Sequence, residues 1–78
     1  MSVMPNNINK HASELTFGDR LRAVRKARGL TQVQLADKAG VAQCLVSTYE
    51  RNAALPGLAV FEWLCIALGV PSSELIGF

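Results

Sequence analysis

Residues 32–52, QVQLADKAGVAQCLVSTYERN, decide how this chain folds. They contain two short helical patterns separated by the small residues Ala39, Gly40 and Val41. A joint this short makes the second helix cross the first steeply, so one helix projects from the surface. The stretch therefore predicts a helix-turn-helix, an arrangement whose projecting helix can enter the major groove of DNA.

Residue types at the ends of these two helices indicate where each begins and stops. Thr31 and Gln34 have the spacing of a capping box, and Gly40 suits the left-handed turn that follows. The second helix should run over about 43–51, with Leu45 or Val46 and then Tyr49 facing inward. Asn52 is suited to a left-handed C-cap after it.

One further helix is predicted before this stretch and two after it. Apolar residues recur at helical spacing over 17–28, where Thr16 can cap the first turn and Gly29 can end the last. Residues 58–68 predict another helix, which Gly69 stops, and Pro71 opens a last short one. The inward stripe over 58–68 should consist of Leu58, Phe61, Leu64, Cys65 and Leu68.

These patterns predict an all-α fold of five helices, because no strand pattern occurs. Residues 16–78 should form a single domain for DNA binding and dimerisation. Residues 1–15 are polar and should form a flexible N-terminal arm, since they cannot bury enough apolar surface to offset their ordering entropy. An alternative is an arm that touches DNA through Lys10 or His11.

Charge and cysteine content limit the function classes. The 78 residues hold 8 Lys and Arg against 6 Asp and Glu, and five of the basic residues lie within residues 20–28. A net charge of +2 excludes a histone-like surface but still permits nucleic-acid binding, because the placement of charge matters more than its total. Cys44, Cys65 and the lone His11 form no metal-ligand motif, so we expect reduced thiols and no metal or cofactor.

Several other functions are not expected from this sequence. No signal peptide or membrane-spanning run occurs, so we expect a cytoplasmic protein without a membrane partner. Neither cysteine has a plausible His partner, and no acid/base cluster suggests an enzyme. Nothing indicates a small-molecule ligand.

The outward face predicted for residues 43–51 carries amide, hydroxyl and thiol groups. Mere solubility would favour Lys and Glu there, whereas amides and hydroxyls can bond base edges. The residues on this face are Gln43, Cys44, Ser47 and Thr48. We therefore expect double-stranded DNA to be a partner of this helix.

Residues 17–76 resemble the lambda-repressor-like (Cro/cI, XRE-type) helix-turn-helix domain. The resemblance rests on the signatures GLTQ…LA…GV, YER and ALGV at the separations typical of that family. It implies a five-helix DNA-binding fold and does not indicate which gene is regulated.

The resemblance also implies site residues. Gln32 would meet a phosphate and pack on Gln43, and Arg25 would form a partly buried salt bridge with Glu50. The implied DNA-binding residues are Gln32, Gln43, Cys44, Ser47, Thr48, Arg51 and Asn52. This chain departs from the family at Ala42, where a capping Ser or Thr is usual, and at the thiol of Cys44, which is a weak hydrogen-bonder.

The helix over 58–68 is apolar nearly all round, which normally indicates burial on every side. We expect this helix and the last short helix to join two copies of the chain into a homodimer, although Trp63 could instead cover the arm or the tail. The predicted dimer-interface residues are Val60, Trp63, Ile66 and Phe78. A dimer would read a near-palindromic operator, most simply as a repressor. The alternative is a protein-interaction module, such as an antitoxin, whose apolar helix binds a different protein.

Overall fold

The computed structural model describes residues 16–76 of the 78-residue chain and shows five α-helices there, with no strand. The helices are α2 (Phe17–Ala27), α3 (Gln32–Ala39), α4 (Gln43–Glu50), α5 (Leu58–Leu68) and α6 (Ser72–Ile76). The predicted all-α, five-helix fold is therefore confirmed. The arm predicted at 1–15 and the predicted interface residue Phe78 lie outside the described residues. None of the described helices is long and apolar enough to span a membrane.

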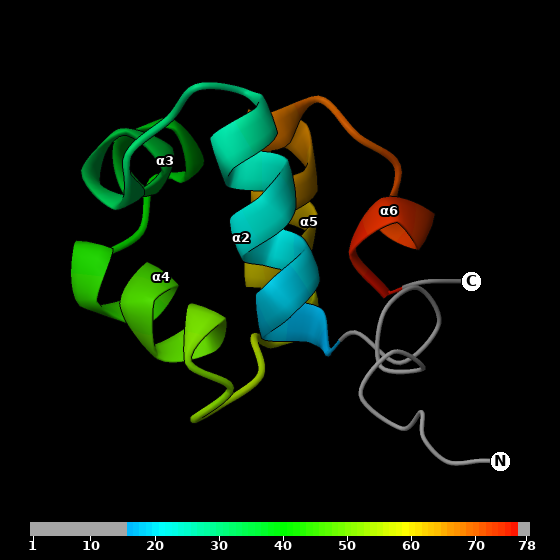
Figure 1. Cartoon of the computed structure of the whole chain (residues 1–78). Helices are drawn as coiled ribbons and strands as arrows, with labels where there is room; N and C mark the ends of the chain where they lie inside the picture. The colour runs from blue at the N-terminus through cyan, green and yellow to red at the C-terminus, as the bar shows by residue number, and fades with distance from the viewer. Residues whose placement is uncertain (1–15, 77–78) are drawn as a thin grey trace, which may run out of the picture.

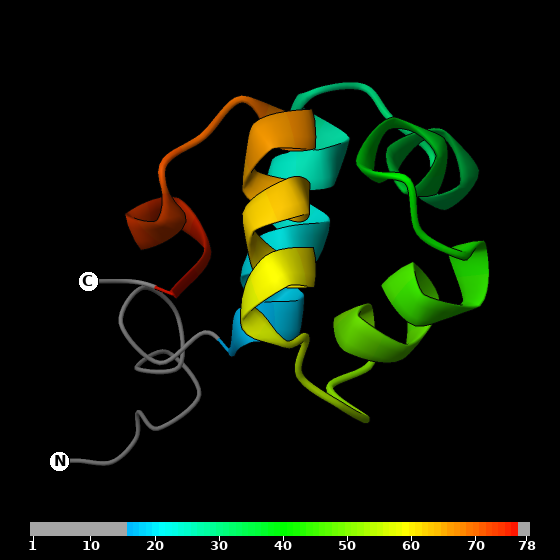
Figure 2. The ribbon, with the colours of Figure 1, turned by 180° about the vertical axis from the view of Figure 1, so that it is seen from behind.

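Helices α2 and α5 run in the same direction through the middle of the domain, one behind the other (Figures 1 and 2). Helices α3 and α4 lie on one side of this pair, and the short α6 lies on the other (Figure 1). Helix α3 packs against α5, while α4 packs against both α3 and α2. This arrangement leaves α4 at the edge of the domain, where part of its surface faces solvent.

The helix ends follow the residue types expected there. Thr16 with Asp19 forms a complete capping box on α2, and Thr31 with Gln34 forms one on α3. Each pair satisfies two backbone N–H groups that would otherwise lack partners at a helix start. Gly40 ends α3 with a φ of 75°, and the non-glycine Asn52 adopts a φ of 62° after α4. Both left-handed turns were predicted from sequence and are confirmed.

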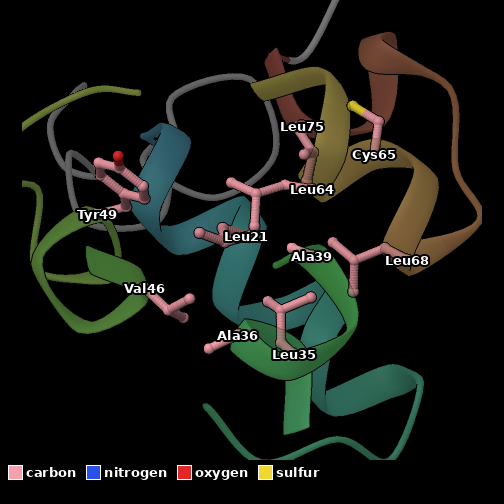
Figure 3. Close-up of a cluster of buried hydrophobic side chains, with 10 residues drawn as sticks. All are labelled: Leu21, Leu35, Ala36, Ala39, Val46, Tyr49, Leu64, Cys65, Leu68 and Leu75. Atoms are coloured by element: carbon pink, nitrogen blue, oxygen red, sulfur yellow. The ribbon is translucent and has the colours of Figure 1, made fainter. Parts of the chain in front are cut away.

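Ten buried apolar side chains form the core between the helices (Figure 3). They come from all five helices: Leu21, Leu35, Ala36, Ala39, Val46, Tyr49, Leu64, Cys65, Leu68 and Leu75. Val46 is fully buried whereas Leu45 is 37% exposed, so Val46 rather than Leu45 joins Tyr49 in anchoring α4 to the core. Since Cys65 lies in this core, burial raises the pKa of its thiol, to which the nearby Glu62 charge also contributes.

Helix α5 differs from the prediction at its first residue. Leu58 was expected on the inward stripe but is 82% exposed, because it begins the helix at the edge of the molecule. Trp63 and Ile66 are 46% and 74% exposed, whereas Val60 is half-buried and packs partly against the core. The outer face of α5 therefore presents two large apolar side chains to solvent.

Candidate nucleic-acid interface

The turn between α3 and α4 sets the direction in which α4 leaves the core. The backbone N–H of Gly40 donates to the carbonyls of Ala36 and Asp37, and the N–H of Val41 donates to Ala36. These bonds close the C-terminus of α3. Ala42 is the N-cap residue of α4 and has an extended backbone, but its side chain makes no capping hydrogen bond. This was predicted from the alanine at a position where Ser or Thr is usual. The N–H of Leu45 donates to the Ala42 carbonyl at 3.0 Å, which leaves the N–H groups of Gln43 and Cys44 available to water or to a phosphate.

The outer face of α4 carries the residues predicted to meet bases. Gln43 and Cys44 are exposed, and Ser47 and Thr48 are half-buried. The Thr48 hydroxyl donates to the backbone carbonyl of Cys44 at 2.8 Å. Because its proton is used within the helix, Thr48 could meet DNA only as a hydrogen-bond acceptor or through its methyl group.

A buried ion pair connects α2 to the far end of α4. Arg25 donates to both carboxylate oxygens of Glu50, at 2.6 and 2.9 Å, and the two side chains are only 9% and 3% exposed. Arg25 also donates to the carbonyl of Leu30 at 2.9 Å. The arginine thus holds α2, α4 and the connection between α2 and α3 in one arrangement.

The surroundings of this pair favour its charged form. Burial alone would raise the pKa of the Glu50 carboxyl, but hydrogen bonds from Arg25 and Gln32 and the charges of Arg25 and Arg22 hold it below the ordinary value. The hydrogen bond with Glu50 raises the pKa of Arg25, although burial opposes this. Glu50 is therefore a carboxylate, which can only accept hydrogen bonds.

Gln32 joins this buried pair to the exposed start of α4. Its Nε2 donates to Glu50 Oε1 at 3.0 Å, and its Oε1 accepts a long hydrogen bond from Gln43 Nε2 at 3.4 Å. The sequence resemblance implied that Gln32 packs on Gln43, and the structure places the two side chains together. The contact between Gln32 and Glu50 was not foreseen, because those residues are 18 positions apart and belong to different helices.

Arg51 and Asn52 follow α4 and are both exposed. The Oδ1 atom of Asn52 accepts a hydrogen bond from the backbone N–H of Gly18 at 3.0 Å. A Cβ added at Gly18 would lie 2.5 Å from the carbonyl oxygen of Tyr49, so the first turn of α2 touches the end of α4 directly. Gly18 was not among the residues predicted from sequence; a glycine in the first turn of a helix was the only available signal of this close approach.

Metal-ligating side chains and thiols are the other groups to consider among the described residues. No group of three or more His, Cys, Asp or Glu side chains that could hold a metal ion occurs within residues 16–76. Both cysteines are free thiols, with Cys44 exposed and Cys65 buried. The arrangement instead consists of a short polar helix held across a second helix by a three-residue turn, which defines the helix-turn-helix class of protein.

The comparison with protein families agrees with this class. The family model described as "Helix-turn-helix domain" matches residues 16–75 of the chain. The chain belongs to the lambda-repressor-like (Cro/cI, XRE-type) helix-turn-helix family, whose members are DNA-binding proteins and not enzymes.

Three similar proteins illustrate the family. The immunity repressor protein of Bacillus phage phi105 is 41% identical over 63 residues, which are 81% of this chain but only 44% of that repressor. This chain therefore spans less than half the length of that relative. The restriction-modification controller protein C.AhdI from Aeromonas hydrophila has a TM-score of 0.75 and 37% identity, covering 77% of this chain and 91% of C.AhdI. SinR, the master regulator for biofilm formation, solved in complex with DNA, has a TM-score of 0.74 and 34% identity, covering 77% of this chain and 97% of SinR.

Proposed function

We propose that this protein is a cytoplasmic, sequence-specific DNA-binding regulator of transcription. It acts as a repressor that occupies a near-palindromic operator as a homodimer. The relatives support this proposal, since they include an immunity repressor, a restriction-modification controller and a regulator solved with DNA. The residues proposed to meet DNA are Gln32, Gln43, Cys44, Ser47, Thr48, Arg51 and Asn52.

One observation carries the DNA-binding proposal. Gln43 stands exposed at the start of α4, and its amide is bonded to Gln32 at the start of α3. Amides can bond adenine through two hydrogen bonds, and a helix start of this kind is the part that a helix-turn-helix presents to base edges. Exposed Arg51 at the other end of α4 is suited to a phosphate contact, which positions a protein without specifying sequence.

Selection of bound duplexes from a random pool tests this function. The wild type should enrich a defined half-site, and Gln43→Ala should relax the preference at one position while other positions keep theirs. Glu74→Ala is a suitable control, because Glu74 is exposed on α6, on the opposite side of α2 from α4 (Figure 1). A wild-type pool without any enriched sequence would refute sequence-specific binding. Binding should also weaken steeply with salt, because phosphate contacts release counterions.

The homodimer is proposed to form through the outer face of α5 and the C-terminal residues, with Val60, Trp63, Ile66 and Phe78 in the interface. Exposed Trp63 and Ile66 support this, since large apolar side chains gathered on one face favour a partner surface. Two recognition helices about 34 Å apart would then reach half-sites one helical turn apart. Light scattering should find a dimer that Trp63→Glu converts to a monomer. A monomeric wild type at high micromolar concentration would contradict the proposal.

The same exposed side chains also favour a second candidate function. In that case the apolar face of α5 binds a different protein, as an antitoxin binds a toxin, and DNA contact is secondary. Purification of a stable complex with an unrelated protein, lost in Trp63→Glu but kept in Gln43→Ala, would favour this function over the operator-binding homodimer.

A further inference from the structure

A continuous chain of hydrogen bonds runs from the buried ion pair to the exposed start of α4. It passes from Arg25 to Glu50, then through the amide of Gln32 to the amide of Gln43. Its inner end is rigid, because two hydrogen bonds at 2.6 and 2.9 Å hold a carboxylate that is almost fully buried. Its outer end lies on the face proposed to meet DNA, so the inference drawn here rests on that proposed function.

The carboxylate determines which way the Gln32 amide points. An ionised carboxylate has no proton to donate, so only the NH₂ end of Gln32 can face it favourably. The contact of 3.0 Å between Gln32 Nε2 and Glu50 Oε1 has this orientation. The carbonyl end of Gln32 is thereby turned outward, toward Gln43.

The orientation then passes to the next amide. A carbonyl oxygen only accepts, so Gln43 turns its NH₂ group toward Gln32, at 3.4 Å. One N–H of Gln43 is used in this bond. The other N–H and the Oε1 atom remain, which together make one donor beside one acceptor.

This remaining pair matches one purine better than the other. In the major groove, adenine presents an acceptor at N7 beside a donor at N6, whereas guanine presents two acceptors, N7 and O6. A freely turning glutamine could offer both of its N–H groups to guanine. A Gln43 amide with one N–H already engaged has a single donor left and suits adenine.

We propose that Glu50, acting through Gln32, is a positioning residue that makes Gln43 prefer adenine to guanine. Glu50 itself does not touch DNA in this scheme, because it lies in the core beneath Gln32. Its effect therefore appears in the choice of base at one operator position and leaves the choice at other positions unchanged.

The test uses selection from a random duplex pool with the full chain. At the position whose preference Gln43→Ala removes, the wild type should enrich adenine over guanine by roughly 5- to 150-fold, the range for one bidentate contact. Gln32→Met keeps the length of a half-buried side chain without its amide, and should lower that ratio about fivefold or more. The loss of any phosphate contact by Gln32 would weaken binding to all sequences alike, so the ratio separates the two effects.

A paired variant, Arg25→Met with Glu50→Leu, tests the carboxylate itself. It replaces the ion pair with apolar side chains and should lower the adenine-to-guanine ratio as Gln32→Met does. An unchanged ratio in Gln32→Met or in the paired variant, or a wild-type preference for guanine at that position, would overturn the positioning role while leaving DNA binding intact. A pool with no enriched sequence would overturn the proposed function and this inference together.

Discussion

Replacing Arg25 with methionine should lower the free energy of unfolding by about 3–5 kcal/mol, the usual cost of removing one partner of a buried ion pair. The structure places this change at the upper end of that range. The Glu50 side chain is only 3% exposed and would lose both hydrogen bonds from Arg25. The carbonyl of Leu30 would lose a third, of 2.9 Å.

A loss of this size is large for so small a domain. At roughly 0.05–0.15 kcal/mol per residue, the described part of the chain should have a total stability of only about 3–9 kcal/mol. Urea unfolding followed by circular dichroism measures the difference directly. Each kcal/mol should also lower the melting temperature by about 4–8 °C, so a thermal scan gives an independent value.

The paired variant Arg25→Met with Glu50→Leu separates ion-pair loss from poor packing. It leaves no charge buried without a partner, so it should regain most of the stability that Arg25→Met loses. Two results would refute the reasoning. One is a loss below about 1 kcal/mol in the single variant, the range of exposed pairs. The other is a paired variant no more stable than the single one.

The remaining predictions concern pH, a close backbone approach and a helix cap. The folded state lowers the pKa of Glu50 from its ordinary value of 4.5. The contribution of the Glu50 carboxylate to the free energy of unfolding is therefore present above that pH and is lost as the pH falls further. Urea titrations from pH 7 to 3 should show this loss, and the paired variant without Glu50 should show a smaller one. Gly18→Ala should destabilise the fold by about 1–3 kcal/mol in thermal scans, because the added Cβ would meet two backbone carbonyl oxygens at 2.5 and 2.8 Å. Gly57→Ala is the control, since a Cβ added there would meet nothing within 4 Å and Gly57 has a φ of −70°. Ala42→Ser should stabilise the protein by about 1 kcal/mol by capping α4, whose N-cap backbone is already extended; an equal gain in Ala42→Val would argue against the capping explanation.

Much of the helix-turn-helix could be predicted from sequence because its signals are local. The capping box predicted at Thr31 joins residues three apart, the cap predicted at Thr16 acts on the first turn of its helix, and the glycine stops act on a single backbone position. The prediction that Leu58 faces inward was wrong for a related reason. Helical periodicity gives the side of a helix on which a residue lies, but it does not indicate whether another element covers that end of the helix.

The site was predictable only in part. The resemblance implied the ion pair of Arg25 and Glu50, which the structure confirms. Two parts of the site stay predictions. They are the DNA contacts of Gln43, Ser47, Thr48 and the other residues proposed to meet DNA, and the dimer face of α5. No signal in the sequence indicated that the Gln32 amide lies between Glu50 and Gln43, since a glutamine side chain can turn either end toward a neighbour.

The sequence by itself determined where the helices begin and end, because caps, glycine stops and apolar periodicity act over a few neighbouring residues. Only the tertiary structure decided that Val46 and not Leu45 anchors α4, that Gly18 lies against the carbonyls of Tyr49 and Glu50, and that Gln32 bonds Glu50. Each of these depends on contacts between helices far apart in the chain. Such contacts are set by how the helices pack, so no local pattern of residue types encodes them.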